Sequence, residues 1–174
     1  MKMEVKDFAL EALNEAQTAL MQAVDGLNQD ELLWEPKPGA NHIAFILWHT
    51  LRVEDWFFQY MFQRTPQVWE SEKWHHKLNL PDDPRVTGFG YTAEQVDSFP
   101  AVQLRDLVAY GEAVRARTVD YLRNLDPARF DEILKSRIFG DVSIGNLISL
   151  MLCEIAQHVG QIAYLRGLVK GEDK

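Results

Sequence analysis

"SIGNLISLMLCEIAQHVGQIAYLRGL", residues 143–168, decides the fold class, because it combines a helix-capping residue with a long and broadly apolar segment. Ser143 is a typical cap, and apolar residues follow it at the three- and four-residue spacing of a helix. At about 100° per residue these positions cover a wide arc, which indicates a helix that packs against more than one neighbour. We therefore expect a long helix from residue 144 to about residue 169.

Three further segments have helical periodicity, namely residues 5–24, residues 42–63 and the stretch from Pro100 to Leu125. Asn41 is the expected cap of the second of these helices, and "TAEQ" at residues 92–95 has the form of a capping box. Residues 65–91 contain three prolines and no sustained period, so we expect a long surface connection there. No hairpin signal is visible. The prediction is an all-α fold, a four-helix bundle in a single domain that spans residues 1–174.

Composition restricts the classes of function. The chain of 174 residues is 47% hydrophobic and 25% charged, as expected of a soluble globular protein. A net charge of −8 argues against a nucleic-acid partner, and no basic amphipathic or long apolar segment predicts a membrane partner. The single cysteine, Cys153, excludes an intrachain disulfide and fits a reducing compartment. Without a signal-peptide pattern at the N-terminus, we expect a cytoplasmic location.

Polar residues on the apolar side of the last helix are the first candidates for a functional site. Glu154 and His158 stand four residues apart and project, with Gln161, between Leu147 and Leu165. Side chains at this spacing reach a common point, because their Cβ atoms are about 5–6 Å apart. A buried carboxylate or imidazole needs a partner, since an unpaired buried charge costs several kcal/mol.

A third candidate, His49, lies on the apolar face of the second predicted helix. His42 shares that face but is about 10 Å away along the axis, so we interpret it as a helix-start residue. Two arrangements would satisfy the polar groups: Glu154 pairs with His158 or Arg52, or it binds a divalent ion together with His158 and His49. Three nitrogen and oxygen ligands with open positions are typical of catalytic metal sites, and two histidines with one carboxylate also suit iron. From spacing alone the ion pair is favoured, because this spacing occurs by chance on many helices.

Two stretches resemble the DinB/YfiT-like superfamily of four-helix-bundle metalloenzymes, and the likeness extends over nearly the whole chain. "LLWEPKPGANHIAFILWHTLRVEDWFF", residues 32–58, is similar to the family's proline-rich turn and its helix with a ligand histidine, here His49, and an acidic residue five positions later, here Glu54. Residues 143–168 are similar to the terminal helix with an HxxxHxGQ pattern. "HVGQ" is intact at residues 158–161, but Glu154 replaces the first histidine.

The resemblance changes the preferred interpretation to a metal site. Family members are described with three histidine ligands that bind nickel or zinc. This implies His49 and His158 as ligands, with Glu154 in the third position; a glutamate also suits iron or manganese. Gln161 is a candidate for orienting His158, with an ordinary hydrogen-bonding role as the alternative.

The same resemblance implies a metal-dependent enzyme of the thiol-dependent S-transferase or hydrolase type. Its substrate would be a small molecule, with a low-molecular-weight thiol among the candidates, and the protein would form a homodimer. The alternative is a non-catalytic bundle that binds a ligand or partner through a degenerate metal site. Glu54 lies about 140° around the helix from His49, so we expect it to pair with Arg52 or with a residue of another helix instead of binding the same ion.

Overall fold

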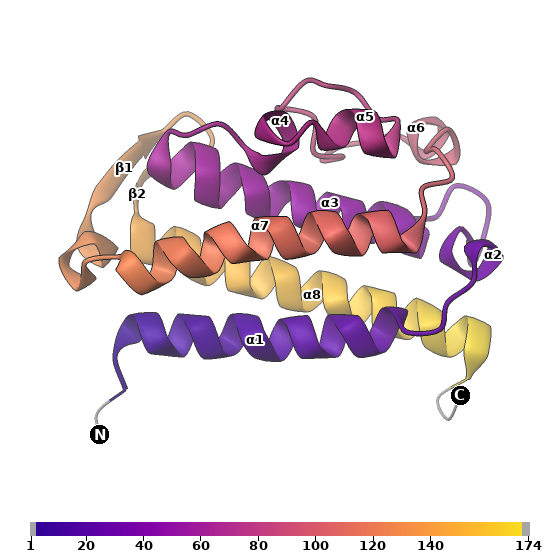
Figure 1. Ribbon diagram of the computed structural model, residues 1–174, viewed down its shortest axis with the longest axis horizontal. Helices are drawn as coiled ribbons and strands as arrows, with labels where there is room; N and C mark the ends of the chain where they lie inside the picture. The colour runs from indigo at the N-terminus through magenta and orange to yellow at the C-terminus, as the bar shows by residue number, and fades with distance from the viewer. Residues whose placement is uncertain (1–2, 172–174) are drawn as a thin grey trace.

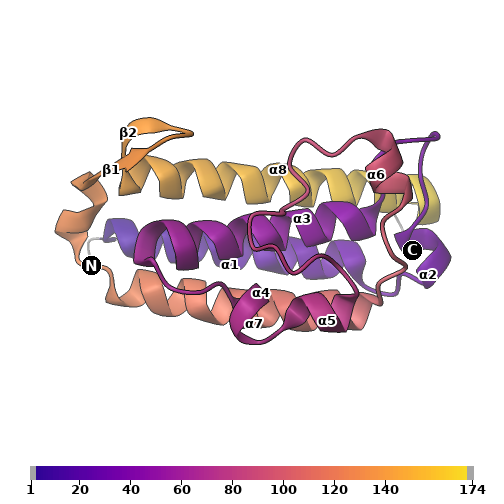
Figure 2. The same ribbon diagram turned by 90° about the horizontal axis from the view of Figure 1, so that it is seen from above.

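The computed structural model describes residues 3–171, and four long helices dominate it (Figure 1). These are α1 (Val5–Val24), α3 (Ile43–Asp55), α7 (Leu104–Asn124) and α8 (Ile144–Lys170). They run lengthwise beside one another, and α8 packs against both α1 and α3 (Figures 1 and 2). The predicted mostly helical fold is confirmed, and the bounds predicted for the first and last helices agree with the structure to within one residue.

The second predicted helix, residues 42–63, does not keep a regular geometry. It continues beyond α3 as a π-helix, η1 (Trp56–Met61), whose wider turns change which side chains face the core. Its cap is also different from the prediction, because His42 and not Asn41 occupies the N-cap position. The Phe45 N–H donates to Nδ1 of the buried His42 over 3.2 Å. An imidazole nitrogen therefore accepts the capping hydrogen bond that we expected an asparagine oxygen to accept.

The long connection between α3 and α7 contains three short helices, as Figure 1 shows. These are α4 (Val68–Ser71), α5 (Trp74–Leu78) and α6 (Ala93–Asp97), and α6 begins with the predicted capping box at Thr92. A further short helix, α2 (Gln29–Leu32), follows α1. The predicted long connection is present, but it is not confined to the surface, because Val68, Trp69, Trp74 and Leu78 of α4 and α5 are buried.

The expectation of a chain without a hairpin is wrong. After the 3₁₀ helix η2 (Pro127–Asp131), the strands β1 (Ile133–Ser136) and β2 (Gly140–Ser143) pair in antiparallel register. Gly140 has the positive φ, +70°, that the turn requires, and the hydroxyl of Ser136 accepts two N–H groups of the turn. Ser143 ends β2 and caps α8, as predicted, by accepting the N–H of Asn146 over 3.1 Å.

The core between the long helices contains charged residues as well as apolar ones. Arg52, Glu54 and Asp55 of α3 are all at most 1% exposed. Each must have a partner to offset the cost of burial. Among residues 3–171, no helix has the length and apolar character that crossing a bilayer requires.

Candidate functional site

The packing of α3 against α8 brings His49 and His158 together. The centroids of the two rings are 5.0 Å apart, and the ring planes are nearly perpendicular, at 86°. Both side chains are partly buried. Two predicted site residues that are more than 100 positions apart in the sequence are thus in contact.

The orientation of His49 is held by a backbone carbonyl. Its Nδ1 donates to the carbonyl oxygen of Thr87 over 2.6 Å, and the ring of Phe45 stacks against it at 6.2 Å. Because a carbonyl only accepts, the proton is on Nδ1, and Nε2 carries the free lone pair. Burial lowers the pKa of His49 below its ordinary 6.5, although the bond to Thr87 opposes the change. The residue is therefore a neutral imidazole that presents Nε2.

His158 is oriented by its own helix in the same way. Its Nδ1 donates to Oε1 of Gln161, one turn further along α8, over 2.9 Å. In the neutral ring Nε2 is then the nitrogen without a proton, and this atom is buried without a hydrogen-bond partner. Gln161, the candidate for orienting His158, is exposed, and its side chain makes the contact that this role requires.

Glu154 lies directly beside the unpartnered nitrogen. Its Oε2 is 3.4 Å from Nε2 of His158, a contact of ionic rather than hydrogen-bonding geometry. The carboxylate is 41% exposed and does not pair with Arg52, whose ionic partner is Asp55. A carboxylate oxygen and an imidazole lone pair both accept, so a positive centre, either a proton or a metal ion, is required between them.

The donor set fits a divalent metal ion. Two imidazoles, each fixed by a bond at Nδ1, and one carboxylate are the ligand types that nickel, zinc, iron and manganese accept. Among residues 3–171, however, no group of three or more His, Cys, Asp or Glu side chains is arranged to hold an ion as it stands. In the structure His49 contacts His158, and His158 contacts Glu154, but the three side chains do not yet surround a common point.

Other residues considered from the sequence lie apart from this cluster. Glu54 forms a bidentate pair with Arg115 of α7, with distances of 2.9 and 2.8 Å, which was one of its two expected partners. Cys153 is exposed.

Sequence reasoning missed Thr87, because the atom that matters is a main-chain oxygen and any residue type supplies one. The only signal nearby is the pair of glycines in "VTGFGY", residues 86–91, which predicts a turn but no partner.

These features describe a mostly helical protein with a cluster of two histidines and one glutamate between two of its long helices. Residues 12–162 match the DinB superfamily, and the chain belongs to it, which confirms the resemblance seen in the sequence. A crystal structure described as a conserved protein from Enterococcus faecalis has a TM-score of 0.87 to this one, covering 98% of this chain and 100% of that chain. Its sequence identity is 22%, so the likeness establishes the fold alone. No curated protein sequence matches the chain.

Proposed function

We propose that this protein is a DinB-like four-helix bundle that binds a divalent metal ion through His49, Glu154 and His158. The carbonyl of Thr87 and the side chain of Gln161 orient the two imidazoles. Nickel or zinc is the expected ion, with iron and manganese as the alternatives that a carboxylate ligand allows.

One observation carries the proposal. Nε2 of His158 is buried, lacks a hydrogen-bond partner and faces the carboxylate of Glu154. Buried polar atoms in native proteins nearly always have a partner, so an unsatisfied one calls for an explanation. A metal ion satisfies both this nitrogen and the facing oxygen.

The chemistry we propose is that of a metal-dependent enzyme, either a thiol-dependent S-transferase or a hydrolase. A divalent ion supplies Lewis acidity, which lowers the pKa of a thiol or water and polarises an oxygen of the substrate. The chain itself holds the two imidazoles in place, and Phe45 covers one side of His49. The substrate would be a small molecule, for which a low-molecular-weight thiol is one candidate.

The location and assembly that we propose are a cytoplasmic homodimer. Apolar side chains on the outer side of α8 support a dimer, since Tyr164 is 69% exposed and Leu168 is 49% exposed. Neither nucleic acid nor a membrane is a proposed partner, because the net charge is −8.

A second candidate function is a binding protein without catalysis, whose metal site is degenerate. The half-exposed Glu154 favours it, because a carboxylate within 3.4 Å of an imidazole is also a plain ion pair of helical neighbours. In that case the positive centre is a proton on His158.

Measuring the metal affinity of the Glu154→Gln variant distinguishes the metal-dependent enzyme from the binding protein with a degenerate site. Calorimetric titration of the chelator-treated protein with zinc or nickel chloride, together with elemental analysis, measures affinity and stoichiometry. Glu112→Gln, at an exposed glutamate of α7, is the matched control. We expect one ion per chain in the wild type and the control, and at least about tenfold weaker binding in Glu154→Gln. Equal affinity in all three proteins would refute Glu154 as a ligand.

A further inference from the structure

The segment that holds His49 in place, residues 80–91, contains neither a helix nor a strand. Its position depends on side chains of α3 and of the neighbouring residues 67–69, which donate to its carbonyl oxygens. Nε1 of Trp69 donates to Pro81, and Nε2 of Gln67 donates to Pro84, with distances of 3.1 and 3.0 Å. His49 donates to the carbonyl of Thr87 further along the same segment.

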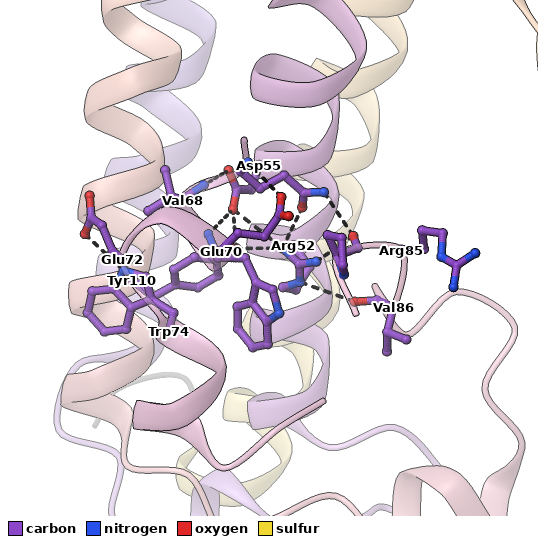
Figure 3. Close-up of polar contacts among 12 residues, drawn as sticks. Arg52, Asp55, Val68, Glu70, Glu72, Trp74, Arg85, Val86 and Tyr110 are labelled. Carbon is purple, nitrogen blue, oxygen red and sulfur yellow. Dashed lines mark hydrogen bonds and ion pairs between the residues drawn. The ribbon is translucent and has the colours of Figure 1, made fainter. Parts of the chain in front are cut away.

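Arg52 makes the most extensive contacts with this segment, as the close-up in Figure 3 shows. Its Nη2 donates to the carbonyl of Pro84 over 2.8 Å, and its Nε donates to that of Val86 over 3.3 Å. Arg52 and His49 are three residues apart on α3, so they lie about one helical turn from each other on neighbouring parts of one surface. The carbonyls of Val86 and Thr87, held by these two side chains, belong to consecutive residues.

The guanidinium itself is rigidly held. Its Nη1 donates to Oε1 of Gln67 over 2.8 Å and to the hydroxyl of Tyr110 over 3.2 Å, and the group stacks on Trp69 at 4.3 Å. The side chain is 0% exposed. Nε, Nη1 and Nη2 are therefore all in use, which a planar guanidinium achieves and a lysine ammonium does not.

Asp55 balances the charge and links this contact to the rest of the fold. Its carboxylate lies 3.5 Å from Nη1 of Arg52 and accepts the N–H groups of Val68 and Trp69, each over 2.9 Å. Tyr110 of α7 donates its hydroxyl to the same carboxylate over 2.8 Å (Figure 3). Burial raises the pKa of Tyr110 well above its ordinary 10, so the hydroxyl remains a donor. The network thus joins α3, α4 and α7 to the segment.

We propose that Arg52 is a positioning residue for the site. By holding the carbonyls of Pro84 and Val86, it keeps the carbonyl of Thr87 on Nδ1 of His49 and so leaves Nε2 of His49 unprotonated and available to a ligand. This inference rests on the proposed metal site for its functional meaning, but the effect on the His49 tautomer does not depend on a metal.

Loss of the guanidinium should change the His49 tautomer and, through it, the affinity for a metal ion. The segment loosens, the bond from Nδ1 to Thr87 competes with water, and part of the His49 population moves its proton to Nε2. Before Nε2 can bind a metal, the proton must then return to Nδ1 and the ring must be ordered, which weakens binding by about 10- to 100-fold, the usual cost of losing a partner behind a ligand.

Arg52→Lys tests the proposal, with Arg115→Lys as the matched control. Arg115 is also mostly buried and also holds a carboxylate and a carbonyl, those of Glu54 and Leu13, both outside residues 80–91. The two readouts are the ring-nitrogen chemical shifts of His49 in the metal-free protein, recorded well above the pKa of histidine, and titration with zinc or nickel chloride. Urea unfolding of all variants gives the general loss of stability.

We expect Arg52→Lys to shift the His49 tautomer toward Nε2–H and to weaken metal binding, while Arg115→Lys changes neither readout despite losing stability. Gln67→Met, measured in parallel, removes the other donor to Pro84 and should shift the tautomer in the same direction by less. The Gln67→Met variant also tests the proposal if Arg52→Lys does not fold. An unchanged tautomer in the folded variants would overturn the proposal. A wild type that binds no metal but shows the tautomer shift in the variants would refute the proposed function and leave the role of Arg52 standing.

Discussion

Replacing Gly88 with alanine should destabilise the protein strongly, because this residue lies where segment 80–91 touches α3. Its φ is +87°, a conformation that costs an alanine about 1–2 kcal/mol. An added Cβ would lie 2.8 Å from Cζ3 of Trp48 and 3.1 Å from the ring of Phe45. Both rings are buried, so overpacking adds about 1–3 kcal/mol, for a total of about 2–5 kcal/mol.

Gly90→Ala is the matched control, two residues further along. Its φ of +74° imposes the same backbone strain, but a Cβ there meets nothing within 4 Å. Urea unfolding should place the midpoint of Gly88→Ala below that of Gly90→Ala by about 0.5–1.5 M, using a slope of about 2 kcal/mol per M. Equal losses in the two variants would refute the packing of this segment on Trp48, and with it the geometry that holds Thr87 to His49.

Three further results follow from individual contacts. In the metal-free protein, stability should fall as the pH drops below 6.5, because burial lowers the pKa of His42 and the neutral ring caps α3; His42→Asn should flatten the unfolding free energy measured between pH 7 and pH 5. The carboxyl of Asp83 should titrate at a pKa of about 2, because Arg85 donates hydrogen bonds to it. The stabilisation from this ion pair is therefore present above the ordinary pKa of 3.8 and lost as the pH falls toward 2. Arg85→Gln should return the pKa of Asp83, measured by NMR, toward 3.8. Ser143→Ala should cost about 1 kcal/mol in thermal unfolding through loss of the α8 cap, and a change within error would contradict that cap.

The long helices were predictable from the sequence because their apolar residues recur with the helical period over many turns. The same periodicity placed His49 and His158 on surfaces that face neighbouring helices, and the structure puts these two rings in contact. Glu154, predicted to lie beside them, contacts His158 but is 41% exposed. The hairpin was missed because each strand has only four residues, too few for an alternating pattern to stand out.

The contacts that orient His49 could not be predicted from the sequence, for a different reason. The carbonyl that orients His49 carries no side-chain signal, and its position depends on contacts across the chain from Arg52 and Gln67. Arg52 was a candidate ion-pair partner for Glu54, two residues further along the same helix, and for Glu154 of the last helix. The structure instead pairs Arg52 with Asp55, a choice set by the packing of α3 against α4 and α7.

The most direct test of the proposed metal centre is X-ray absorption at the zinc edge of the zinc-loaded protein. We predict two imidazole ligands and at least one oxygen ligand, with nitrogen distances of about 2.0–2.1 Å and oxygen distances of about 2.0–2.2 Å. His49→Ala should then lose one imidazole and keep the other. A wild type that takes up no zinc, or whose zinc spectrum shows no imidazole and does not respond to His49→Ala, would contradict the site.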